Sequence, residues 1–112
     1  MTIDKALASV AVKDIKTAVQ WYEKVFGRPA DSTPMPGLAE WKFAGGGGLQ
    51  VYALPERAGS CSCTLTVSDI DLEASRLEKL GVATGSKMGD QVKVFMVKDP
   101  DGNSIAFAQD PK

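Results

Sequence analysis

The chain has 112 residues, of which 44% are apolar, 24% charged and 7% aromatic, as expected for one globular domain. Thirteen Lys and Arg residues against fourteen Asp and Glu give a formal net charge of −1, so no basic surplus is left to bind nucleic acid or an anionic membrane. The sequence contains no histidine, which excludes Ser-His-Asp catalysis, Cys-His catalysis and His-ligated metal sites. No apolar run approaches the roughly 20 residues that span a bilayer, and no signal peptide stands out, so we expect a cytoplasmic protein.

The two cysteines, Cys61 and Cys63, are two positions apart in an expected strand. Their side chains then point the same way at roughly 6.5 Å or more, beyond the ~4 Å that a disulfide requires. This spacing favours reduced, packed thiols. A redox pair or half of a soft-metal site remains the alternative.

An internal repeat organises the chain. Sliding the sequence by 55 residues places residues 10–15 over residues 65–70, an apolar strand followed by Asp and Ile in both cases. We therefore expect a single domain, residues 1–112, built of two repeats at about 1–56 and 57–112. Two repeats are too few for a solenoid, so they must bury each other.

Each repeat contains one predicted helix. In the first, Asp14 suits the N-cap, the helix extends to about Phe26, and Gly27 suits the C-terminal cap. In the second, Asp69 and Gly81 take the same places. Apolar residues recur at helical spacing in both segments and predict one buried face for each helix. These residues are Ile15, Ala18, Val19, Tyr22, Val25 and Phe26 in the first helix and Ile70, Ala74, Leu77 and Leu80 in the second.

The other segments alternate short apolar runs with Pro, Gly, Asp and Asn, a pattern typical of strands and turns. The expected strands are residues 6–12, 41–44, 49–54, 61–67, 91–97 and 104–108, with a weak strand in each half near 30–33 and 83–87. Each half is therefore β-α-β-β-β. The segment 31–37, which contains Pro34 and Pro36, is expected to be a loop that borders a cleft.

Two loops invite a ligand-binding interpretation that their sequences do not support. Residues 45–48 are all glycine but lack the Gly-Lys-Ser/Thr ending and the following helix of a phosphate loop, so they predict a hairpin turn. Residues 99–103, Asp-Pro-Asp-Gly-Asn, lack the later acidic residue of a calcium loop. They predict a turn as well.

The combination of two β-α-β-β-β units, the Trp-Tyr-Glu-Lys-Val-Phe-Gly segment at 21–27 and the Asp-Pro-Asp-Gly-Asn-Ser-Ile segment at 99–105 resembles the vicinal oxygen chelate superfamily. That superfamily includes glyoxalase I, extradiol dioxygenases, fosfomycin-resistance enzymes and bleomycin-resistance proteins. The resemblance implies an α+β fold in which the two modules form a cup of curled mixed sheets with the helices outside. It also implies a homodimer.

The resemblance further implies where a metal would be held. In metal-dependent members four ligands project into the cup, and by position they correspond to Leu7, Gln50, Ser62 and Ala106. Among these side chains only Gln50 is a candidate to coordinate a divalent ion, because Leu and Ala offer no donor atoms. The sequence therefore predicts no metal and no other cofactor, and it favours a protein that is not an enzyme.

Strand alternation predicts which side chains line the cup in the first module. Gln50 and Tyr52 share the cup face. If the hairpin at 45–48 has an even-numbered loop, Trp41 and Phe43 share that face, whereas an odd loop reverses them. Ordinary core or interface packing is the alternative role for these aromatic residues.

In the second module, a four-residue turn at 99–102 places Phe95 opposite Ala106 in the cup and Met96 on the helix side. Ser62 and Thr64 line the cup from the module's first strand. The predicted ligand-binding residues are therefore Trp41, Phe43, Gln50, Tyr52, Ser62, Thr64 and Phe95.

These residues would give a cavity with aromatic walls and a few neutral hydrogen-bonding groups, which suits a small aromatic or amphipathic molecule. The first hypothesis is a metal-free binding protein that resembles the drug-sequestering bleomycin-resistance proteins. The second is a glyoxalase-like lyase or dioxygenase-like enzyme with a non-standard metal or none, in which Tyr52, Glu40 or Glu56 transfers a proton. The third is a dimeric interaction module without a ligand.

Overall fold

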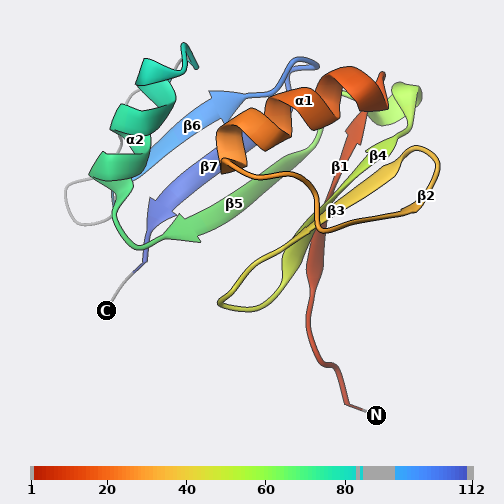
Figure 1. Cartoon of the computed structure of the whole chain (residues 1–112), viewed down its shortest axis with the longest axis horizontal. Helices are drawn as coiled ribbons and strands as arrows, with labels where there is room; N and C mark the ends of the chain where they lie inside the picture. Colours follow the sequence, from red (N-terminus) through yellow and green to blue (C-terminus); the bar gives the residue numbers. More distant parts are fainter. Residues whose placement is uncertain (1, 83, 85–92, 111–112) are drawn as a thin grey trace.

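The structure, a computed structural model, describes residues 2–82, 84 and 93–110 and consists of two related modules (Figure 1). The first module contains β1 (Leu7–Val12), α1 (Ile15–Phe26), β2 (Ser32–Met35), β3 (Leu38–Lys42) and β4 (Gly48–Ala53). After a short 3-10 turn, η1 (Pro55–Arg57), the second contains β5 (Ser62–Val67), α2 (Ile70–Lys79), β6 (Val94–Lys98) and β7 (Ser104–Gln109). This order confirms the α+β fold that the family resemblance implies.

Both helices begin at the predicted N-caps, and α1 ends at the predicted glycine. In α2 the C-cap is Leu80, one residue before the predicted Gly81, which follows in the left-handed region with φ of 81°. Leu80, predicted on the buried face of this helix, is exposed because it lies beyond the last helical turn. The Asp14 carboxylate accepts a hydrogen bond from the Lys16 amide, and Gly27 ends α1 in the left-handed region with φ of 75°. The Asp69 carboxylate caps α2 in the same way through the Leu72 amide. No helix in the described part of the chain is long and apolar enough to cross a membrane.

The two modules use the same strand pairing. In the first sheet, with order β1-β4-β3-β2, β1 is parallel to β4 and the other pairs are antiparallel. In the second sheet, with order β5-β7-β6, β5 is parallel to β7. The segment predicted as a loop at 31–37 contains the edge strand β2, and the weak strand predicted at 83–87 lies outside the described residues.

The hydrophobic core lies on one face of the sheets, where alternate strand residues pack against the helices. The largest of its fully buried side chains are Trp41, Tyr22, Phe95, Leu49, Ile70, Leu77 and Ile105. The opposite side of the sheets, which we call the open face, presents residues of intermediate or high exposure such as Gln50, Tyr52 and Thr64. The open face is therefore where a ligand can reach the sheets.

Asn103, a fully buried residue of the 99–103 loop, joins the two modules. Its side-chain carbonyl accepts 2.9 Å hydrogen bonds from the backbone amides of Gly59 and Cys61, and its amide donates 2.8 Å bonds to the carbonyl of Ala11 and to Asp99. Close by, the Ala11 amide contacts the Cys61 sulfur at 3.4 Å. Away from this joint β1 and β5 diverge, as Figure 1 shows.

Both hairpin loops are one residue longer than the predicted cup lining requires. Lys42 pairs with Gly48 around a loop of residues 43–47, and Lys98 pairs with Ser104 around a loop of residues 99–103. Left-handed glycines, Gly47 in the first loop and Gly102 in the second, allow the extra residue. Because side chains alternate along a strand, one additional loop residue turns every side chain of the strand to the other face of the sheet. The side chains of β3 and β6 therefore lie on the faces opposite to those predicted with four-residue loops.

Candidate functional site

A pocket of about 410 Å³ lies on the open face of the first sheet, bordered by the turn between β2 and β3. We call it the open-face pocket. Two predicted site residues, Gln50 and Tyr52, lie side by side in it on β4. Its lining residues are Ser9, Met35, Pro36, Gly37, Leu38, Gln50, Tyr52 and Ala53. The segment 31–37 therefore does border a cleft, although part of it is a strand.

A row of polar side chains crosses the sheet beside this pocket. The Ser9 hydroxyl donates to Gln50 Oε1 at 3.2 Å, and Gln50 Nε2 donates to Glu40 Oε2 at 2.6 Å. The Ser32 hydroxyl donates to the other Glu40 oxygen at 3.4 Å. Glu40 thus belongs to this row. The sequence analysis named Glu40 only in its second hypothesis, as a residue that transfers a proton. Strand alternation places it there: Glu40 lies on the open face, beside the pocket, because its neighbour Trp41 faces the core.

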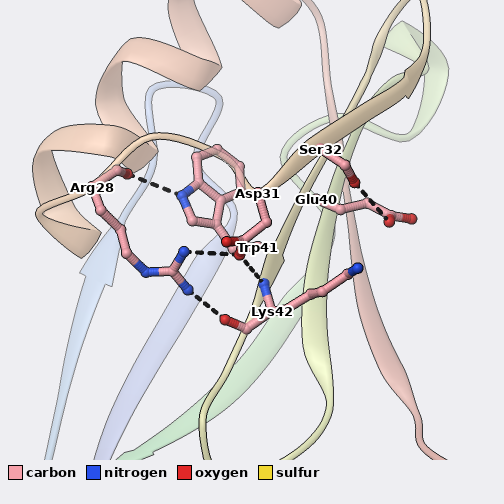
Figure 2. A network of polar contacts seen from close by, with 6 residues as sticks. All are labelled: Arg28, Asp31, Ser32, Glu40, Trp41 and Lys42. Carbon is pink, nitrogen blue, oxygen red and sulfur yellow. Dashed lines mark hydrogen bonds and ion pairs between the residues drawn. The ribbon is translucent and has the colours of Figure 1, made fainter.

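Trp41 lies on the opposite side of β3 from Glu40, as Figure 2 shows, so its placement in the cup under an even loop is wrong. The indole is fully buried, with its ring 5.5 Å from Phe26 and 6.0 Å from Tyr22. Its Nε1 donates a 3.1 Å hydrogen bond to the Arg28 carbonyl. Because the loop has an odd number of residues, Trp41 is a core residue that lies on the face of the sheet opposite the open-face pocket.

The residues around Trp41 fix the end of β3 (Figure 2). The Asp31 carboxylate accepts from the Lys42 amide at 2.6 Å and from the Arg28 guanidinium at 2.8 Å, and Arg28 also donates to the Lys42 carbonyl. The Lys42 amide, followed by Arg28, holds the pKa of Asp31 below its ordinary value. This network positions the strand and does not face the open-face pocket.

Phe95 is also a core residue, and the predicted pairing of β6 with β7 is wrong by one position. Phe95 pairs with Phe107 rather than with Ala106, and the two rings stack at 5.1 Å. Phe95 is fully buried, whereas Met96, expected on the helix side, is exposed. The five-residue loop at 99–103 explains both differences.

Phe43 and Thr64 line a second hollow of about 640 Å³, which we call the inter-module cleft. It lies between the diverging modules, and Phe26, Phe107, Arg28 and Arg76 also contribute to it. Both arginines already have partners: Arg28 binds Asp31, and Arg76 binds Glu73 and the carbonyl of Val25. The structure thus places Phe43 and Thr64 in a different hollow from Gln50 and Tyr52. Ser62, on β5, is exposed and lines neither hollow.

The positions that the family resemblance assigns to metal ligands do not fit a metal ion. Leu7, Gln50, Ser62 and Ala106 together offer one amide and one hydroxyl, and the aliphatic side chains of Leu7 and Ala106 offer no donor atoms. Among the described residues, no three His, Cys, Asp or Glu side chains are grouped closely enough to hold one elsewhere. The donor set at these positions is therefore too poor for a divalent metal ion.

The two cysteines are free and half-buried. Burial, and to a smaller extent the nearby Asp99 carboxylate, raises the pKa of the Cys63 thiol to about 11. A thiol in this environment is a poor nucleophile. Cys63 is thus a packing residue.

Comparison with known proteins decides the family. The sequence profile of the Glyoxalase/Bleomycin resistance protein/Dioxygenase superfamily matches residues 2–107. The chain belongs to this superfamily. A glyoxalase/bleomycin resistance protein from Catenulispora acidiphila is 32% identical, with a TM-score of 0.87 over 97% of this chain and 100% of that chain. None of the curated proteins matches the sequence significantly.

Two further similar structures come from Streptomyces sp. CB03234. TnmS3, described as an antibiotic binding protein, is 27% identical, with a TM-score of 0.83 over 99% of each chain. A glyoxalase/bleomycin resistance protein is also 27% identical, with a TM-score of 0.79 over 94% of this chain and 99% of that chain. The superfamily resemblance predicted from the sequence is thereby confirmed.

Proposed function

We propose that this superfamily member is a metal-free protein that binds a small aromatic or amphipathic molecule in the open-face pocket. The observation that carries the proposal is the placement of Gln50 and Tyr52 together in a 410 Å³ pocket on the open face of the first sheet. This volume falls within the range of about 300–1,000 Å³ that small-molecule sites occupy. The antibiotic-binding relative TnmS3 supports the same function class.

The pocket combines an apolar wall with a few directional polar groups. Leu38 pairs with Tyr52 across the antiparallel strands, so the two side chains form one apolar and aromatic surface. Gln50 and Ser9 supply hydrogen-bonding atoms at its edge. An aromatic ring on Tyr52 would gain roughly 0.5–1.5 kcal/mol beyond the area that it buries.

The proposal extends to a homodimer in the cytoplasm. Membership of the superfamily supports this part of the proposal, because the family resemblance implies a homodimer. Sedimentation equilibrium measures the oligomeric state directly. A monomer at all micromolar concentrations would contradict the dimer without affecting the pocket.

The binding function is tested by titrating the isotope-labelled protein with 2-naphthylmethanol, a neutral aromatic probe, and following amide NMR shifts. We expect shifts at Leu38, Gln50 and Tyr52, and Tyr52→Ala should weaken binding about fivefold or more because it removes the stacking surface. Phe43→Ala, in the inter-module cleft, is the matched control and should leave the affinity unchanged. Shifts confined to Phe43 and Thr64 would move the site to that cleft.

The metal-free part of the proposal has a separate test. Elemental analysis of the purified protein should find no zinc, nickel, manganese or iron at stoichiometric amounts. The reason is that the side chains at the implied ligand positions supply too few donors to hold such an ion. A bound ion at one equivalent per chain would contradict the metal-free proposal.

A further inference from the structure

The hydrogen bonds beside the open-face pocket converge on one carboxylate. Ser9 donates to Gln50, and Gln50 donates to Glu40 through a 2.6 Å bond. Ser32 donates to Glu40 from the other side. Gln50 and Ser32 thus donate to the two oxygens of Glu40 and fix the position of its carboxylate, while Ser9 holds the Gln50 side chain.

Glu40 has no cationic partner within the described residues. The ion pairs there join Arg28 to Asp31, Arg76 to Glu73 and Lys93 to Asp71. Lys42, two residues further along β3, is exposed and forms no ion pair with Glu40. A carboxylate has about four acceptor positions, of which two are occupied here. Glu40 is half-buried, so a ligand that brings a cationic donor would meet an acceptor that is already oriented and partly desolvated.

The apolar surface of the pocket lies within one ligand's length of this carboxylate. Glu40 pairs with Gln50 in the sheet, and Leu38 pairs with Tyr52 two positions along. Glu40 and Tyr52 are therefore diagonal neighbours, which are about 7–8 Å apart in a sheet of this kind. A ring on Tyr52 and Leu38 would thus place an ammonium group on a short aliphatic link beside Glu40. A carboxylate at the same position would be repelled.

On the basis of the proposed binding function, we propose that the open-face pocket selects molecules that combine an aromatic or apolar ring with a protonated amine, and that Glu40 binds the amine. Gln50 and Ser32 act as positioning residues because they hold the Glu40 carboxylate through hydrogen bonds. Tyr52 and Leu38 contact the ring.

Three probes that share one ring system test the selection: 2-naphthylmethylamine, 2-naphthylmethanol and 2-naphthoic acid. Dissociation constants are measured from amide NMR titrations at neutral pH and low salt. We expect the amine to bind about tenfold tighter than the alcohol, because a charge-assisted hydrogen bond replaces a neutral one. The acid should bind more weakly than both. Added salt should weaken binding of the amine and leave binding of the alcohol unchanged.

Glu40→Gln should reduce the amine's affinity to that of the alcohol while the alcohol's own affinity is retained. Glu56→Gln removes an exposed acidic side chain of η1, outside the pocket, and should preserve the preference. An amine that binds no tighter than the alcohol, or a preference that survives Glu40→Gln, overturns the assignment of Glu40 while the binding function stands. If none of the probes shifts the pocket amides at millimolar concentration, both proposals fail.

Discussion

The hydroxyl of Tyr22 on α1 donates a 2.8 Å hydrogen bond to the carboxylate of Asp99, which lies in the loop between β6 and β7. Both residues are buried, and they belong to different modules. Asp99 also accepts from the backbone amides of Asp101 and Asn103, so the carboxylate fixes the loop that joins the halves. Burial, followed by the charge of Asp99, raises the pKa of Tyr22 above its ordinary value. The phenol therefore remains a donor throughout the physiological range.

Tyr22→Phe should lower the free energy of unfolding by about 1–2 kcal/mol, because it removes this donor and leaves Asp99 with one partner fewer. Urea unfolding measures the change. Tyr52→Phe is the matched control: no hydrogen bond of its hydroxyl exists in the described structure, so its effect should stay within about 0.5 kcal/mol. Equal stabilities for the two variants would show that the Tyr22–Asp99 contact contributes nothing.

The contrast between Asp14 and Trp41 shows how far the sequence predicts this molecule. The helix caps bond to backbone groups only two to four residues away along the chain, as Asp14, Gly27 and Asp69 do. Local sequence is therefore enough to predict where these helices start and where α1 ends. The repeat likewise predicts both modules, because each strand and helix signal occurs twice. These features need no knowledge of loop length.

The face of Trp41 instead depends on whether five or four residues separate two strands. The glycines near Gly47 accept either count, so the sequence alone does not decide it. Phe95 is misplaced for the same reason, through the loop that contains Gly102. Gln50 and Tyr52 are placed correctly because their face depends only on alternation against Leu49 and Val51. Their meeting with Met35 and Leu38 depends on the tertiary path of the β2–β3 turn.

Trp41 and Tyr52 should consequently respond to mutation in opposite ways. Trp41→Phe should cost about 2 kcal/mol of unfolding free energy, since it leaves unfilled volume and the Arg28 carbonyl without its donor. The affinity for 2-naphthylmethanol should remain unchanged. Tyr52→Ala should weaken binding with a loss of stability below about 1 kcal/mol. Weaker probe binding by a fully folded Trp41→Phe protein would contradict this prediction and indicate that the indole contacts the ligand.

The pKa of Cys63, raised to about 11 from an ordinary value of 9.0, predicts a pH dependence of both reactivity and stability. The folded protein keeps this thiol protonated where the unfolded chain ionises. Its contribution to stability is therefore fully present below pH 9 and is lost as the pH rises from 9 to 11. Iodoacetamide alkylation of Cys63, followed by mass spectrometry, should reach half its maximal rate near pH 11 in the folded protein. In urea the half-maximal rate should fall near pH 9, and identical profiles in both states would contradict the burial of this thiol.

Gly48, where β4 begins, is expected to tolerate no side chain. A Cβ atom there would lie 2.5 Å from the carbonyl oxygen of Trp41 and 2.6 Å from Leu7 Cδ2, and the carbonyl belongs to the paired strand and has no room to move. Gly48→Ala should therefore destabilise the protein by about 1–3 kcal/mol. Gly45→Ala is the matched control, because a Cβ there meets nothing within 4 Å and its φ is not positive. Thermal unfolding of both variants decides the matter: two unchanged midpoints would mean that β3 and β4 lie further apart at Gly48 than this register requires.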